Sequence, residues 1–219
     1  MENVLKRDQA VTIASLVAVT ALAWAYLVAL AGDIGAMPEV APWSAIDFWL
    51  MLVMWAVMMV GMMLPSAAPM ILLYAAVSRK QRGRGHVFAP TGVFAAGYLV
   101  AWTVFSLAAT ALQWALEQAA LLSPMMVGAS PYLGGALLIT AGVYQWTPLK
   151  HACLENCRAP AEFLSRIWRP GTGGAVAMGV HHGAYCIGCC WVLMGLLFVG
   201  GVMNLLWVAA RLNSVQATK

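Results

Sequence analysis

A short apolar segment, residues 178–194, holds two histidines and three cysteines: His181, His182, Cys186, Cys189 and Cys190. On an α-helix, residues four apart share a face, so His182, Cys186 and Cys190 form one stripe. Cys189 lies at its edge, and His181 faces about a quarter turn away. Thiolate and imidazole are ligands that Cu(I) and Zn(II) favour. The segment therefore predicts a soft-metal site on a helix, although a buried cysteine also serves as a small hydrophobe.

A second set of ligand types precedes this segment and consists of His151, Cys153 and Cys157. If the preceding helix continues, Cys153 and Cys157 share one face, where their two sulfurs could bind the same ion. We interpret this set as a separate site at the cytoplasmic end of the fourth predicted span, which receives the ion or hands it on. The alternative is a pair of interfacial thiols with no shared ligand.

Methionines recur along residues 51–63 at helical spacing. One predicted helix face carries Met51, Met54, Met58 and Met62. Thioether sulfur is a soft ligand, and this segment is expected at the same membrane depth as the Cys/His segment. We therefore expect Met58 and Met62 to contribute thioethers to the same site. That pairing rests on depth alone, and filling gaps in a core is the common alternative role of methionine.

The composition indicates a membrane protein. Of the 219 residues, 63% are hydrophobic and 9% are charged, and the mean hydropathy is +0.81. These values are typical of a polytopic helical bundle and argue against a water-soluble domain with a large core. The net charge of +4 does not indicate nucleic-acid binding, because the basic residues lie in short loops beside apolar runs.

We predict an all-α fold: one membrane domain, residues 1–219, with about five full transmembrane helices and a shortened sixth. The predicted spans cover residues 10–31, 47–77, 90–116, 132–149 and 172–199, with a short helix over 202–212. Pro65 and Pro69 lie inside the second span, where each removes a backbone donor and favours a kink. At ~1.5 Å per residue, the last helix is too short to cross the bilayer fully.

Basic residues are confined to alternate loops. Lys and Arg occur in the amino-terminal tail, in 79–86, in 150–169 and in the carboxyl-terminal tail, whereas the other loops carry only acids. Basic loops stay on the cytoplasmic side of a membrane. This pattern predicts a multi-pass protein of the cytoplasmic membrane with a cytoplasmic amino terminus.

Two other functional classes remain open. No Asp, Glu, Lys or Arg lies in the middle of a predicted span, and no phosphate-binding loop occurs, so the sequence does not favour an enzyme, a proton-coupled carrier or an ATP-driven pump. Cys186 and Cys189 form a Cys-x-x-Cys, which fits a membrane thiol redox protein. A structural or assembly subunit, in which the Cys and His side chains only pack, is the third class.

Three runs carry a family resemblance: residues 58–70, 147–158 and 179–191. Together they resemble the bacterial family called domain of unknown function 2182, whose members are described as predicted metal-binding integral membrane proteins; the likeness covers about residues 45–208. The resemblance implies a helical bundle of the bacterial inner membrane with a metal-related role, and it supplies no substrate or mechanism. Near Met203, where family members begin a full last membrane helix, this chain departs and soon ends.

The leading hypothesis is a protein that binds, and transports or delivers, a soft transition-metal ion, with Cu(I) ahead of Zn(II). The expected core ligands are on the 178–194 segment, with thioethers from Met58 and Met62. Cys153 and Cys157 would exchange the ion with the cytosol. The expected partners are the lipid bilayer, the metal ion, and a metallochaperone or another membrane protein, with no nucleic acid.

Overall fold

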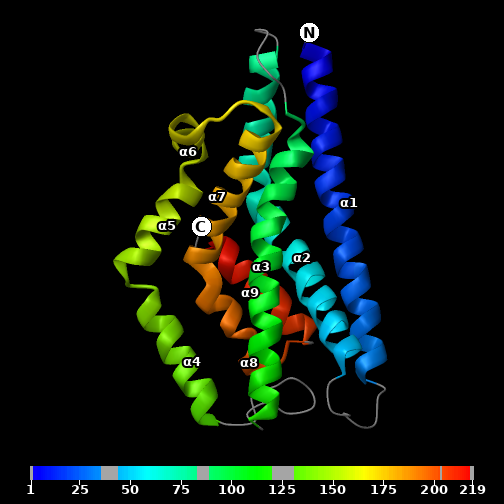
Figure 1. Ribbon diagram of the computed structural model, residues 1–219, viewed down its shortest axis with the longest axis vertical. Coiled ribbons are helices and arrows are strands. Elements are labelled where there is room, and N and C mark those ends of the chain that lie inside the picture. Colours follow the sequence, from blue (N-terminus) through cyan, green and yellow to red (C-terminus); the bar gives the residue numbers. More distant parts are fainter. Residues whose placement is uncertain (1, 36–43, 83–88, 120–130, 203, 218–219) are drawn as a thin grey trace.

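The computed structural model describes residues 2–35, 44–82, 89–119, 131–202 and 204–217. Every regular element in these ranges is a helix, so the predicted all-α helical bundle is confirmed (Figure 1). The helices are α1 (Glu2–Gly35), α2 (Ala45–Arg82), α3 (Thr91–Gln118), α4 (Pro131–Tyr144), α5 (Pro148–Arg158), α6 (Pro160–Ile167), α7 (Gly171–Gly195), α8 (Leu197–Gly200) and α9 (Leu205–Ala217).

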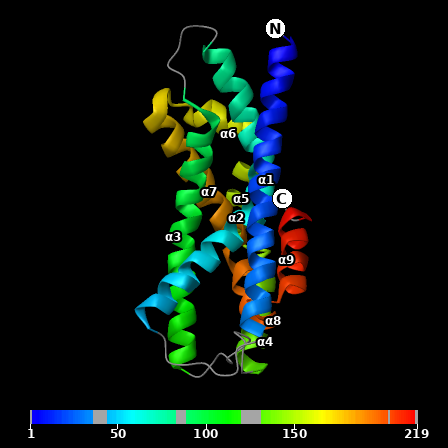
Figure 2. The same cartoon turned by 90° about the vertical axis from the view of Figure 1, so that its right-hand side faces the viewer.

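Four helical segments are long and apolar enough to cross a membrane. They cover Arg7–Gly32, Ala45–Gln81, Thr91–Gln118 and Gly171–Gly200, with 26 to 37 residues each. A span needs about 20 predominantly apolar residues, so each of these segments exceeds the requirement. Pro65 and Pro69 lie inside α2, and Figure 2 shows the two halves of this helix running in different directions. These helices are therefore consistent with a membrane protein.

The closest helix packing joins α3 to α7, and glycines make it possible. A Cβ added to Gly179 would lie 2.1 Å from the carbonyl oxygen of Phe94, and one added to Gly97 would lie 2.4 Å from that of Val176. Gly183 continues the same seam one turn further along α7. Small residues at such spacing let two membrane helices bring their backbones together. This contact fixes the position of α7 against the rest of the bundle.

The predicted span 132–149 is not one helix. The helix α4 ends at Tyr144, and α5 begins at Pro148. Thr147 has extended backbone angles, φ −75° and ψ 144°, and its side chain accepts a bond from the backbone amide of Lys150. A residue before proline is disfavoured in the helical region, and proline suits the first helical turn, so the Thr147–Pro148 pair ends one helix and starts the next.

Because of this break, α5 packs against α7 (Figure 1). We expected five full spans. In the part of the chain that the structure describes, four helical segments are long and apolar enough to cross a membrane, and a shorter apolar helix over Gly134–Tyr144 stands where we expected the fourth span. The helix α9 has 13 residues, fewer than the ~20 needed to cross. It follows Gly201, whose φ of 90° glycine tolerates at no steric cost.

The α3–α7 contact makes a prediction about stability. Gly179→Ala should lower the unfolding free energy by about 1–3 kcal/mol, because the new methyl group meets backbone that cannot give way. Gly173→Ala on the same helix is the matched control, since a Cβ there meets nothing within 4 Å. Thermal unfolding of both variants in detergent measures the difference. Equal midpoints would show that the seam is not tight.

Candidate metal centre

The helices α5 and α7 bring two cysteine sulfurs together. Cys157 Sγ on α5 lies 3.9 Å from Cys189 Sγ on α7. Cys189 is buried, whereas Cys157 is partly exposed. Our separation of the cysteines into two sets is therefore wrong, because the break at Thr147–Pro148 lets α5 lie along α7.

Cys153 lies one turn earlier on α5 and also contacts α7. Its sulfur occupies the space beside Gly188, where an added Cβ would lie 2.6 Å from Cys153 Sγ. The hydroxyl of Tyr144 donates a hydrogen bond to the carbonyl oxygen of Gly188. Because Gly188 has no side chain, the Cys153 thiol of α5 and the Tyr144 hydroxyl at the end of α4 both reach its backbone. The position of α5 therefore depends on this glycine.

The remaining two cysteines of α7 are fully buried. The thiols of Cys189 and Cys190 both donate to the carbonyl oxygen of Cys186, at 3.1 Å and 2.8 Å. Cys186 Sγ lies 3.2 Å from the hydroxyl of Tyr98 on α3, and that hydroxyl donates to the carbonyl oxygen of Met63 on α2 at 3.1 Å. The cysteines of α7 therefore contact two different helices: Cys186 contacts α3, and Cys189 contacts α5.

The three candidate histidines differ sharply in their surroundings. His182 is buried among aromatic rings, with centroid distances of 5.4 Å to Phe163, 5.6 Å to Tyr98 and 6.3 Å to Phe94. His181 and His151 are exposed. The structure therefore brings His182 into the interior that holds the cysteines, and it does not bring His181 or His151 there.

Met58 and Met62 are buried in the same core cluster as the cysteines of α7. However, α3 packs against both α2 and α7. Tyr98 on α3 connects α2 to α7, because its hydroxyl hydrogen-bonds to both the Met63 carbonyl and the Cys186 sulfur. The methionines thus share the interior with the cysteines, and Tyr98 lies between the helices that carry them. Sequence reasoning missed Tyr98, although its hydroxyl is a polar group in the middle of an apolar span.

The sulfur pair is suited to one soft ion. A zinc–sulfur bond is about 2.3 Å, so two thiolates on one ion of that size lie at most ~4.6 Å apart, and 3.9 Å is within this range. Among the described residues, no three His, Cys, Asp or Glu side chains form a group that could hold an ion. A two-sulfur site suits Cu(I), which soft thiolates select, better than structural Zn(II), which takes four ligands.

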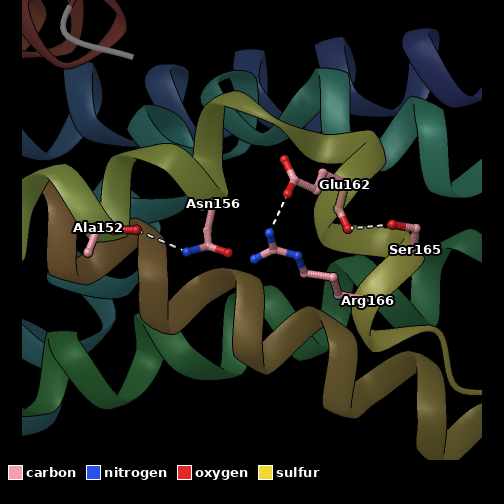
Figure 3. Close-up of polar contacts among 5 residues, drawn as sticks. All are labelled: Ala152, Asn156, Glu162, Ser165 and Arg166. Atoms are coloured by element: carbon pink, nitrogen blue, oxygen red, sulfur yellow. Dashed lines mark hydrogen bonds and ion pairs between the residues drawn. The ribbon is translucent and has the colours of Figure 1, made fainter.

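Figure 3 shows Asn156, Glu162 and Arg166 on α5 and α6, and these residues line a small polar pocket. It has a volume of about 60 Å³ and is lined by Glu155, Asn156, Ala159, Glu162, Phe163 and Arg166. Glu162 pairs with Arg166, and the Asn156 amide donates to the carbonyl of Ala152. Phe163 links this pocket to the interior, since its ring also contacts His182. Sequence reasoning missed the pocket, because its residues lie on two helices that only the fold brings together.

The fold and the buried sulfurs define a class of protein: an apolar helical bundle with buried cysteines. A family model identifies it further, because the PpoB2 family, described as a copper chaperone, matches residues 52–219. The chain belongs to this family. The match supports the metal-related role implied by the resemblance given above, under a different family name, and it names copper and not zinc. Neither the curated proteins nor the solved structures gave a match to this chain.

The contact at Gly188 makes a prediction about thiol reactivity. Gly188→Ala should displace the Cys153 sulfur and raise its alkylation rate severalfold, with little loss of stability, because the displaced atom ends a short side chain. Gly195→Ala, where a Cβ meets nothing within 4 Å, is the control. Peptide mass spectrometry after timed alkylation gives the rate for each cysteine. An unchanged rate at Cys153 would show that the two helices are further apart.

Proposed function

We propose that this protein binds Cu(I) as cargo inside the membrane and delivers it to a partner, with Cys157 and Cys189 as the first ligands. The observation that carries the proposal is the 3.9 Å separation of these sulfurs across two helices. Membership of a copper chaperone family supports the choice of metal. Soft thiolates are the ligands that Cu(I) prefers over harder groups.

Further ligands lie on either side of this pair. Cys153 is four residues before Cys157 on α5, so its sulfur is one turn away on the same face. The buried stripe on α7 and the thioethers of Met58 and Met62 offer further ligands among the buried residues of the bundle. We infer that the ion moves between these groups, from the partly exposed Cys157 toward the interior or in reverse. His151 and His181 are left out of this ligand set because their side chains are exposed.

We also infer the setting of the protein from its charges. Four apolar helical segments long enough to cross a bilayer support a multi-pass protein. The confinement of Lys and Arg to alternate loops supports a cytoplasmic amino terminus in the bacterial inner membrane. The recipient or donor of the ion would be a metallochaperone or another membrane protein that reaches the α5–α6 corner, where the pocket opens.

The same geometry favours one rival function, a membrane thiol redox protein. Cys157 and Cys189 would form the disulfide in place of the Cys186–Cys189 pair expected from the sequence, because Cys157 lies close to the Cys189 sulfur. The two thiols would lose two electrons and two protons to an oxidant such as a membrane quinone. A disulfide bond of about 2.05 Å needs only a small approach of the two helices.

Metal content separates these functions. The wild-type protein, purified without oxygen in detergent and supplied with Cu(I), should hold about one copper ion per chain. The double variant Cys157→Ser/Cys189→Ser should bind Cu(I) at least about tenfold more weakly. His181→Asn, an exposed candidate ligand on the same helix, should keep the copper. Mass spectrometry quantifies copper and zinc, and chelator competition gives the affinity.

Three results would contradict the proposal. A wild-type protein that takes up no copper removes it, and a reversible Cys157–Cys189 disulfide in that protein would establish the redox function. Copper retained in the double variant would place the site elsewhere. Cysteines whose replacement changes neither metal content nor redox behaviour would leave a structural subunit.

A further inference from the structure

A lysine is buried beside the cysteine site. Lys150 is in the first turn of α5, and only 4% of its surface is exposed. Lysine is almost never fully buried unless an opposite charge pairs with it, because removing an ammonium from water is costly. The role of this side chain is not explained by the packing of α5 alone, since any apolar residue would fill the same space.

The buried face of α5 carries this lysine and the two thiols together. Lys150, Cys153 and Cys157 follow at intervals of three and four residues, which is one helix face. All three are buried or half-buried, whereas His151 and Glu155 on the other side of the helix are exposed. Because α5 packs on α7, the face of α5 that carries Lys150 lies in the same interface as the sulfur pair.

The groups that interact electrostatically with Lys150 are mainly thiols. Cys189 and Cys190 on α7 would attract the ammonium if ionised, and Arg158 at the far end of α5 repels it. Among the residues that the structure describes, no carboxylate forms an ion pair with Lys150. Among the described residues, the thiols of Cys189 and Cys190 are therefore the groups that could supply a balancing negative charge, as thiolates.

We propose that Lys150 is the counter-charge of the copper site and selects a monovalent ion. This inference rests on the proposed function. Two thiolates with one Cu(I) carry a net charge of −1, which the ammonium neutralises. Two thiolates with a divalent ion are already neutral, so the same ammonium would remain unbalanced in a medium where charge is costly. A neutral disulfide or a pair of neutral thiols would leave it unbalanced as well.

Replacement of the charge tests this inference. In the full-length protein in detergent, Lys150→Gln should weaken Cu(I) binding by about tenfold, because a unit charge is lost from an interior of low dielectric constant. Lys150→Arg, which keeps the charge, should stay within about threefold of wild type, and Lys80→Gln, at an exposed lysine, should bind like wild type. Chelator competition measures each affinity. If Lys150→Gln does not fold, Lys150→Leu takes its place.

Divalent ions distinguish a charge effect from a structural one. The affinity for Cd(II) should be unchanged or higher in Lys150→Gln, or Cd(II) should bind to neither protein. An equal loss of Cu(I) and Cd(II) affinity, an unchanged Cu(I) affinity, or a loss shared by Lys150→Arg would overturn the inference. A wild-type protein that binds no Cu(I) removes the proposed function together with this inference, whereas normal copper binding by Lys150→Gln removes this inference alone.

Discussion

The contact between the sulfurs of Cys157 and Cys189 depends on how closely α3 and α5 pack against α7. Gly179 and Gly183 admit the backbone of α3, and Gly188 admits the Cys153 thiol of α5. In an apolar medium, helices gain little from hydrophobic burial against each other, so close backbone contact and hydrogen bonds hold them together. The bonds from Tyr98 and Tyr144 to carbonyl oxygens have this role here. The glycines of α7 therefore fix the positions from which the sulfurs approach each other.

This arrangement explains how soft ligands can be kept available inside an apolar bundle. A buried thiol behaves as a small hydrophobe when neutral, and it becomes a strong ligand when a metal ion displaces its proton, which is released to water or to a base. Cys189 is held by its bond to the Cys186 carbonyl, while Cys157 is the partly exposed member of the pair. Under the proposed function, this partly exposed thiol would bind an arriving ion first, and the buried thiol beside it would bind the ion next.

The sequence predicted the helices, because apolar length and helical spacing are local properties of the chain. It did not predict the pairing of Cys157 with Cys189, since these residues are 32 positions apart and their contact depends on where α5 lies. The basic residues of 150–169 suggested a cytoplasmic loop, and the break at Thr147–Pro148 was not recognised. Spacing on one helix also could not show that His181 is exposed while His182 is enclosed by aromatic rings.

We propose that one copper ion is bound by sulfur from both α5 and α7. X-ray absorption spectroscopy at the copper edge tests it most directly, on protein loaded with a single equivalent of Cu(I) in the absence of oxygen. We expect two or three short copper–sulfur bonds, with one fewer when Cys157 alone is replaced by serine. A copper ion surrounded only by nitrogen and oxygen, or a sulfur count unchanged in the Cys157→Ser variant, would contradict it.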